Sequence, residues 1–375
     1  PEPALDHDKS MEQFGTVIEH FPRHEIVPAA RYSLAWCYND LGLAEKATEE
    51  MEALAVAYPD HRFTPQAWMF VGEHMFDKGS LEKSVEAYRA VMQHPESQWF
   101  DDALYKFAWT QYRLSNPEKA ISSFLALVDL GSGKDRGKAI LEKESMDYIA
   151  VSFSESDIRG EKGLERATKF VEKFGDDFKG TQILHRLARV YREQGRYEMS
   201  RKTYRTLLRM YPDYAQGPLV ERELLALQER DLPPEEINRR KVAFFERYNA
   251  SSDWAQSQAD SAARNRGDSL AAEMLYDAGI AYHQIALQKN DSSHYGRAAE
   301  AYRDFIRAYP RSNRANECHY NYAEILFSVG DYHQAAEEYM AVSKRYPESK
   351  YRETAAWNAI VASQNLLKQE ETHRQ

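Results

Sequence analysis

Residues 316–347 read NECHYNYAEILFSVGDYHQAAEEYMAVSKRYP, and this stretch predicts two antiparallel helices joined by a turn. The first helix carries the small residue Ala323, and Gly330 supplies the turn after it. On the second helix Ala335 permits close approach of the two helices, and Tyr339 fills the space one turn later. Pro347 cannot continue a helix, so we expect it to end the hairpin.

The same pattern returns along the chain at a nearly constant interval. An aromatic residue or a histidine precedes a closing proline in several places, and neighbouring closing prolines lie 36 or 37 residues apart, as in Pro22, Pro59, Pro95 and in Pro310, Pro347. A further closing proline is Pro212, and a weaker unit covers residues 143–175. A period of this length predicts stacked helical hairpins.

The order of small residue, turn glycine, small residue, aromatic residue and closing proline resembles the tetratricopeptide repeat. This resemblance implies an all-α solenoid of antiparallel hairpins that forms a right-handed superhelix and binds protein partners on its concave face. The period exceeds the ~34 residues of the common repeat, which predicts a slightly longer link between hairpins.

The links between hairpins have a recurring form, seen in Tyr309-Pro310-Arg311-Ser312 and in Tyr346-Pro347-Glu348-Ser349. This form resembles the repeats of bacterial envelope proteins, namely the lipoprotein subunit of the outer-membrane β-barrel assembly machine and the periplasmic Tol-Pal coordinating protein. The resemblance implies a periplasmic or outer-membrane-associated protein of a Gram-negative bacterium. A cytoplasmic location is the alternative.

The regular pattern fails between about 213 and 270, where Pro218, Pro233 and Pro234 interrupt it and Gly267-Asp268-Ser269 has the composition of a turn or linker. We therefore expect three parts. These are an N-terminal array of about five units after a partial first helix (1–215), a degenerate helical pair and linker (216–270), and C-terminal units with a capping helix (271–375).

Composition excludes several classes of protein. The 375 residues contain 49 Lys and Arg against 59 Asp and Glu, so the net charge of −10 argues against general nucleic-acid binding. No apolar run is long enough to span a bilayer, so membrane association would need a partner or a removed anchor. The two cysteines, Cys37 and Cys318, are too far apart in a solenoid for a disulfide and too few for a zinc site.

No catalytic motif is recognisable in the sequence. The segment 130–135 resembles a phosphate-binding loop, but Val128 and Asp135 replace the glycine and the hydroxyl residue that such a loop requires, so we expect a turn. The histidines lack companions at metal-binding spacing. We therefore expect a non-enzymatic protein with no cofactor and no metal.

A partner is expected to lie against the first helix of each hairpin, on the side that faces away from the second helix. The first three units place there a wall of mostly aromatic residues, which anchor interfaces well because they bring a large contact area at low entropy cost. The alternative is that these side chains pack between neighbouring hairpins. The wall consists of Tyr32, Trp36, Met69, Phe76, Tyr105, Trp109 and Tyr112.

The fifth unit is basic. Residues 179–210 contain nine Lys and Arg and two Asp and Glu, and His185, Arg189 and Arg192 fall on the same stripe of the first helix. Neighbouring arginines suit a carboxylate, so an acidic partner segment is predicted. The alternative is a solvated basic face that pairs with acidic neighbouring repeats.

Beyond the irregular middle a second aromatic stretch includes Tyr276, His283, Tyr320 and Phe327. Together these features predict a monomeric, non-enzymatic scaffold that binds protein or peptide segments in a bacterial envelope complex. One alternative is a structural subunit of a secretion, motility or cell-division machine that contacts its neighbours by its convex face and ends. Another is a module that binds cell-wall glycan.

Overall fold

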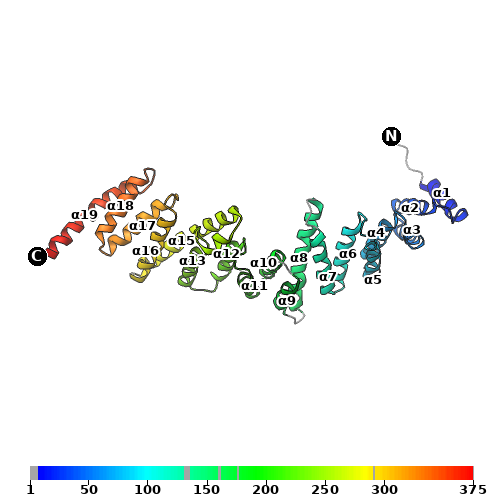
Figure 1. Cartoon of the computed structure of the whole chain (residues 1–375), viewed down its shortest axis with the longest axis horizontal. Helices are drawn as coiled ribbons and strands as arrows, with labels where there is room; N and C mark the ends of the chain where they lie inside the picture. Colours follow the sequence, from blue (N-terminus) through cyan, green and yellow to red (C-terminus); the bar gives the residue numbers. More distant parts are fainter. Residues whose placement is uncertain (1–6, 131–135, 159–161, 175–176, 290–291, 375) are drawn as a thin grey trace. The chain divides into compact units, whose positions relative to one another are not determined.

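The computed structural model describes the chain except for residues 1–6, 131–135, 159–161, 175–176, 290–291 and 375 (Figure 1). The described residues form helices and no strands, which confirms the predicted all-α fold. They divide into two compact units, unit 1 (1–200) and unit 2 (201–375). The three-part division made from the sequence stays a prediction, and the predicted turn at 131–135 lies outside the described residues.

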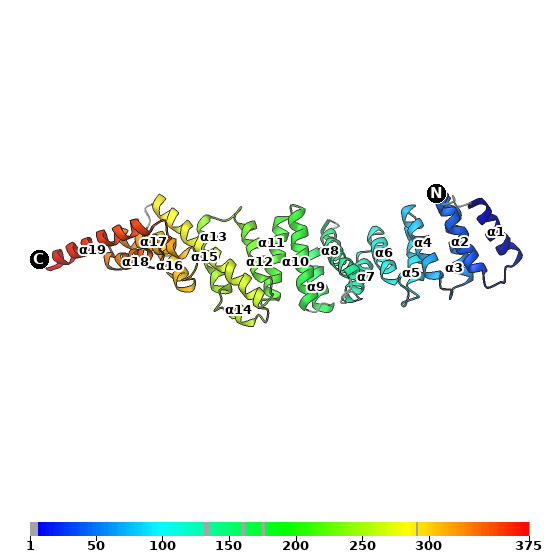
Figure 2. The ribbon, with the colours of Figure 1, turned by 90° about the horizontal axis from the view of Figure 1, so that it is seen from above.

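Unit 1 is a series of antiparallel helical hairpins, and its successive helices from α1 to α5 lie side by side in Figure 2. In the described ranges no helix is both long and apolar enough to cross a membrane. The helices are α1 (His7–His20), α2 (Val27–Asp40), α3 (Ala44–Ala57), α4 (Thr64–Asp77), α5 (Leu81–Val91), α6 (Phe100–Arg113), α7 (Pro117–Leu130), α8 (Arg136–Ile158), α9 (Gly163–Phe174) and α10 (Asp177–Glu193). The division between the units falls within α11 (Tyr197–Met210).

Unit 2 begins irregularly and then returns to hairpins. Its helices are α12 (Gly217–Gln228), α13 (Pro234–Tyr248), the short α14 (Asp253–Ser257), the long α15 (Ser261–Lys289), α16 (Ser292–Ala308), α17 (Ala315–Ser328), α18 (Tyr332–Arg345) and α19 (Arg352–Arg374). The pairs α15/α16 and α17/α18 are hairpins, and α19 packs on α18.

The turn inside a hairpin needs a left-handed backbone. Gly42, Gly79, Gly195 and Gly330 have φ values of 73°, 76°, 73° and 83°, which glycine adopts without a steric penalty. The predicted turn glycine Gly330 is therefore confirmed, and the other three glycines hold the same place in their hairpins. In the third hairpin Ser115 takes the same conformation at φ 62°, so the turn geometry persists even where the sequence lacks glycine.

Small residues on the first helices allow aromatic rings of the second helices to pack directly on the helix backbone. A Cβ atom added to Gly72 would lie 2.6 Å from Cε1 of Tyr88, and one added to Gly279 would lie 2.9 Å from Cε1 of Tyr302. Both tyrosines are fully buried. The close helix approach that the sequence predicted is thus present in both units.

Substituting Gly72 by alanine is expected to lower the free energy of unfolding by about 1–3 kcal/mol, because the new methyl group would overlap the buried ring of Tyr88. Gly15→Ala is the control, since nothing lies within 4 Å of a Cβ at Gly15 and alanine favours a helix. Guanidinium denaturation followed by circular dichroism measures both variants. Equal stability of the two variants would contradict the close packing.

The Tyr-Pro-x-Ser links are explained by contacts between successive links. The hydroxyl of Tyr346 donates to the carbonyl oxygen of Pro310 at 3.2 Å, one repeat earlier. The serine acts locally, because Ser312 Oγ accepts from the backbone N–H of Arg314 at 3.3 Å, just before α17 begins. Tyr346 joins two neighbouring links, whereas the hydroxyl of Tyr309 bonds to Asp268 in α15. The proline ends the second helix, and the serine helps to start the next first helix.

The predicted linker at 267–269 is wrong, because these residues lie inside α15. A Cβ atom on Gly267 would lie 2.4 Å from Cζ3 of Trp254, so glycine is needed there for close packing rather than for a turn. Asp268 Oδ1 accepts from the backbone N–H of Ala250 at 2.9 Å and from the hydroxyl of Tyr309 at 2.8 Å. These tertiary contacts outweigh the local turn propensity of the sequence.

Candidate functional site

The first helices of successive hairpins in unit 1 touch one another directly. Trp36 of α2 meets the edge of Phe70 of α4 with ring centroids 5.8 Å apart. Lys106 Nζ of α6 lies 2.9 Å from Glu73 Oε2 of α4. The surface made by α2, α4, α6, α8 and α10 is called here the first-helix face of unit 1.

At the start of this face, the expected partner-binding residues pack between hairpins. The ring of Tyr32 stacks on Phe63, with centroids 4.2 Å apart, and both Tyr32 and Trp36 are half-buried. Met69 is buried in a cluster with Tyr88 and other core residues and is only 8% exposed. Met69 is therefore corrected from a surface residue to a core residue, because its side chain fills the space between α4 and its neighbours.

Phe76 and its neighbour Glu73 connect the second hairpin to the third. The guanidinium of Arg113 lies 4.5 Å from the centroid of the half-buried Phe76 ring. Glu73 accepts from Lys106 Nζ at 2.9 Å and from the hydroxyl of the buried Tyr88 at 3.2 Å. These contacts link the second and third hairpins, and they leave Phe76 only partly exposed.

Four half-buried rings gather on α6 and α8, and they are called here the aromatic cluster: Tyr105, Trp109, Tyr112 and Tyr148. Trp109 is at the centre, with its ring centroid 4.2 Å from that of Tyr148 and 5.5 Å from that of Tyr112. The first three were expected from the repeat pattern, whereas Tyr148, which belongs to the weakly matching unit, was not. The structure thus brings together residues from two repeats.

Two carboxylates orient the phenols of this cluster. The hydroxyl of Tyr105 donates to Glu144 Oε2 at 2.9 Å, and the hydroxyl of Tyr112 donates to Glu155 Oε1 at 2.5 Å. Burial raises the pKa of Tyr105 to about 12 and raises the pKa of Tyr112 as well, with the nearby carboxylates adding to the effect. Both phenols are therefore protonated donors at neutral pH, and the hydrogen bonds hold the rings in fixed orientations.

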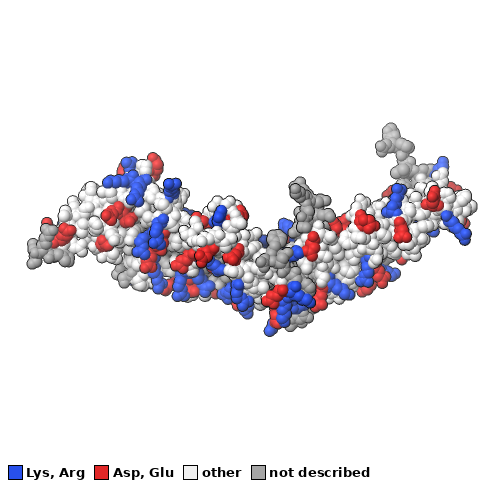
Figure 3. Space-filling model, in the orientation of Figure 1, with Lys and Arg blue, Asp and Glu red and all other residues white. Residues whose placement is uncertain are grey.

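Part of the basic run on α10 is neutralised by neighbouring helices. Arg186 Nε lies 2.8 Å from Asp147 Oδ1 of α8, and Lys179 pairs with Asp129. On the face visible in Figure 3, acidic and basic side chains are likewise interspersed. The alternative of pairing with acidic repeats therefore accounts for these two residues.

The three basic residues expected to bind a partner lie in different surroundings. His185 and Arg192 are half-buried and already interact with other groups. Arg189 is exposed, and within the described part of the chain it has no hydrogen-bond or ion-pair partner. Arg189 lies about one helical turn from Arg186, on the helix that packs on α8 beside the aromatic cluster.

In unit 2, the corresponding surface is made by α15, α17 and α19, and it is called here the first-helix face of unit 2. The hydroxyl of Tyr276 donates to Glu317 Oε2 at 2.9 Å, and the hydroxyl of Tyr351 donates to Glu317 Oε1 at 3.1 Å. The Tyr320 ring stacks on Tyr351 with centroids 4.4 Å apart. Tyr276 and Tyr320 therefore act mainly as bridges between successive hairpins.

The other two residues expected on this face are also half-buried. His283 Nδ1 lies 3.4 Å from the hydroxyl of Tyr302, and burial lowers the pKa of this histidine, which favours its neutral form. Phe327 meets the edge of Tyr332 with centroids 5.2 Å apart. In the described ranges, no three histidine, cysteine or acidic side chains gather as metal ligands would.

Comparison with protein families identifies tetratricopeptide repeats in three parts of the chain. Models of this repeat match residues 102–130, 181–214 and 286–350. The first match contains most of α6 and all of α7, the second contains Arg189, and the third contains α17 and α18. The comparison with the sequences of curated proteins found no match.

Solved structures with similar helical arrays include a tetratricopeptide repeat protein from Parabacteroides merdae. It is 11% identical, with a TM-score of 0.31, and the alignment covers 94% of this chain and 99% of that one. The tetratricopeptide repeat domain of P58(IPK) is 13% identical, with a TM-score of 0.25, and the alignment covers 98% of this chain and 95% of that domain.

Proposed function

We infer from the tetratricopeptide repeats of this chain that it is a scaffold for protein–protein interaction, and we propose that it binds a partner segment on the first-helix face of unit 1. The observation that carries the proposal is the exposed Arg189 on α10, next to the helix that shares the aromatic cluster with α6. The proposed activity is binding without catalysis.

The chemistry of this surface indicates the kind of segment that it would bind. Rings that are already oriented provide apolar contact area without a further loss of side-chain freedom. An exposed guanidinium can form a charge-assisted hydrogen bond with a carboxylate. We therefore propose a partner segment with at least one apolar side chain for the aromatic cluster and an acidic residue for Arg189.

The resemblance of the links to envelope repeats supports a proposal for the cellular setting. We propose a monomer that is periplasmic or associated with the outer membrane within an envelope complex. Light scattering of the purified chain measures its mass, and fractionation of the native bacterium measures its compartment. A dimer or a purely cytosolic protein would contradict the respective part of this proposal.

Trp109→Ala and Arg189→Glu are each expected to weaken partner binding by about tenfold or more, since truncation of central aromatic and arginine contacts has effects of this size. Partners are captured from envelope and cytosolic extracts, identified, purified and titrated against each variant by calorimetry. Arg205→Glu is the matched control, because Arg205 is also exposed but lies on α11 outside the first-helix face.

The control variant is expected to retain the affinity of the unmodified chain. If all three variants bind the purified partner equally well, the first-helix face of unit 1 is not the binding surface. Circular dichroism of each variant excludes unfolding as the cause of any loss.

A second candidate function is assembly with a neighbouring subunit through α19. This helix exposes three large apolar side chains, Trp357 at 67%, Ile360 at 52% and Leu367 at 60%. Their spacing of three and seven residues places them on one side of the helix. If Trp357→Ser with Ile360→Ser abolishes capture while Trp109→Ala does not, this second function replaces the first.

A further inference from the structure

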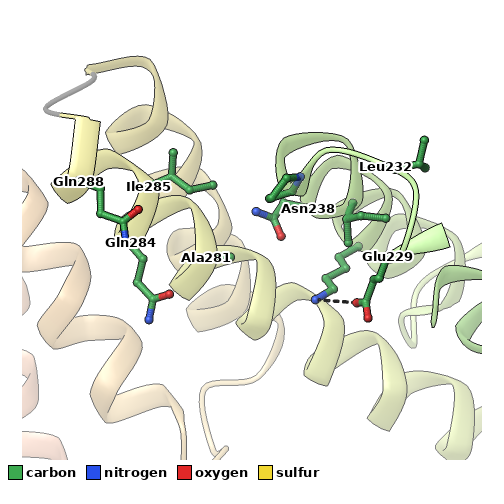
Figure 4. Close-up of a pocket in the computed structure, with 10 residues that line it drawn as sticks. Glu229, Leu232, Asn238, Ala281, Gln284, Ile285 and Gln288 are labelled. Atoms are coloured by element: carbon green, nitrogen blue, oxygen red, sulfur yellow. Dashed lines mark ion pairs between the residues drawn. The ribbon is translucent and has the colours of Figure 1, made fainter. Parts of the chain in front are cut away.

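A cavity of about 330 Å³ lies between α13 and α15 in unit 2 (Figure 4). Its volume is at the lower end of the roughly 300–1,000 Å³ that ligand pockets occupy. Aliphatic side chains contribute much of the lining, and the polar lining consists of three amides and one ion pair. The aliphatic residues are Leu232, Pro234, Ile237, Ala281 and Ile285.

Asn238 of α13 provides an unused hydrogen-bond donor at this cavity. The residue is only 3% exposed, and its Nδ2 atom has no acceptor within the described structure. In Figure 4 its amide lies on the side of α13 that faces Ile285 and Gln288 of α15. Because buried N–H groups almost always have a partner, this donor needs an acceptor that the described chain does not supply, such as a water molecule or a ligand.

Gln284 and Gln288 line the opposite wall, one turn apart on α15. Both are exposed, and neither side chain bonds to another described residue. The four residues from Gln284 to Gln288 rise about 6 Å along the helix, which is close to the roughly 6.6 Å between residues i and i+2 of an extended chain. Each amide offers both a donor and an acceptor, as a peptide main chain does.

The charge at the cavity is balanced. Lys241 Nζ lies 3.6 Å from Glu229 Oε1, and this pair is drawn as a dashed line in Figure 4. The remaining polar groups of the lining are the three neutral amides. A ligand with a net charge would therefore meet no unpaired opposite charge in this lining, whereas a neutral amide backbone would find matching partners.

We propose that this cavity binds an uncharged, extended peptide segment. A main-chain carbonyl of the segment accepts from Asn238 Nδ2, an aliphatic side chain packs against Ile237 and Ile285, and Gln284 and Gln288 bond main-chain amides that are two residues apart. This site is distinct from the first-helix face of unit 1 and shares no residue with it.

The probe is N-acetyl-leucine methylamide, which carries two peptide groups and one aliphatic side chain. It is titrated into the full chain with isoleucine methyl groups labelled for NMR, and the signals of Ile237 and Ile285 are followed. Saturable shifts of both signals with millimolar affinity are expected. N-methylacetamide, which lacks the side chain, is expected to bind at least tenfold more weakly. Absence of saturation, or equal binding of the two probes, overturns the proposal.

Asn238→Leu is expected to weaken binding of the leucine probe about five- to tenfold, as loss of one hydrogen bond does. Because this variant alters a buried residue, Gln284→Leu with Gln288→Leu provides a second test at exposed positions, and a similar loss is expected. Gln364→Leu, an exposed glutamine of α19, is the matched control and should bind the probe unchanged. If Asn238→Leu and Gln284→Leu with Gln288→Leu both bind the probe with unchanged affinity, the proposal is overturned. Arg189→Glu should not affect probe binding.

Discussion

Replacing Trp254 with alanine is expected to destabilise unit 2 by about 3–5 kcal/mol, the usual cost of removing a buried tryptophan ring. Trp254 is 4% exposed and lies in the core between α13, α14 and α15. Its ring centroid lies 5.2 Å from that of Tyr248, and its Nε1 donates to the carbonyl oxygen of Tyr214 at 3.1 Å. Its loss would leave a cavity, and the carbonyl oxygen of Tyr214 would lose this hydrogen bond while keeping the one that it accepts from the backbone N–H of Gly217 at 2.7 Å.

Hydrogen exchange of the full chain, measured by mass spectrometry, separates the effect on the two units. Peptides from α13 to α15 are expected to lose protection in Trp254→Ala, whereas peptides from α2 to α5 in unit 1 keep it. Trp357→Ala is the control, because Trp357 is 67% exposed and its loss should change the stability by less than about 0.5 kcal/mol. Equal protection in Trp254→Ala and the unmodified chain would contradict the central role of this ring.

Alkaline pH is expected to destabilise the whole chain. Burial raises the pKa of Tyr88, Tyr248, Tyr302, Tyr309 and Tyr339, so these phenols stay protonated in the folded protein when they already ionise in the unfolded one. Their contribution to the free energy of unfolding is fully present below about pH 10, the pKa of tyrosine in the unfolded chain. It is lost as the pH rises towards the pKa of tyrosine in the folded protein. At about pH 11 the ionisation of each fully buried tyrosine in the unfolded chain lowers the free energy of unfolding by about 1.4 kcal/mol.

Denaturant unfolding at a series of pH values from about 8 to about 11 measures this effect. Tyr248→Phe loses the hydrogen bond to Glu221 Oε2, which is 2.7 Å long, and is less stable at neutral pH. Its stability is expected to fall less steeply above pH 10, because one titrating group is absent. Tyr197→Phe, at a residue that is 38% exposed, serves as the control for the loss of a phenol. An unchanged slope in Tyr248→Phe would contradict the assignment.

Much of the fold follows from the repeat pattern because its signals are local. The turn glycines, the closing prolines and the small residues on first helices each act within one hairpin. Gly330 adopts φ 83°, and Gly72 lies against Tyr88, as the pattern predicts. The Tyr-Pro-x-Ser links are also local, with the exception of the tyrosine hydroxyl, which reaches back one repeat.

The candidate site was predictable only in outline, because its residues depend on contacts between hairpins. The stripe on the first helices includes Trp109 and Arg189, yet the same spacing selects Met69, whose side chain is buried. Glu144 and Glu155 orient two phenols from 39 and 43 residues away in sequence. Such partners carry no periodic signal, and they lie in the unit that matches the repeat pattern least well.

The helical hairpins, their order and the helix of each hairpin that carries the aromatic stripe could be predicted from the sequence, because helix periodicity and turn chemistry act over a few residues. The continuation of the helix through residues 267–269 depends on packing instead, since the ring of Trp254 lies where a side chain at Gly267 would stand. Tertiary packing likewise left Arg189 exposed while neighbouring charges found partners. Packing and charge pairing between helices therefore select, from a periodic stripe, the few side chains that remain available to a partner.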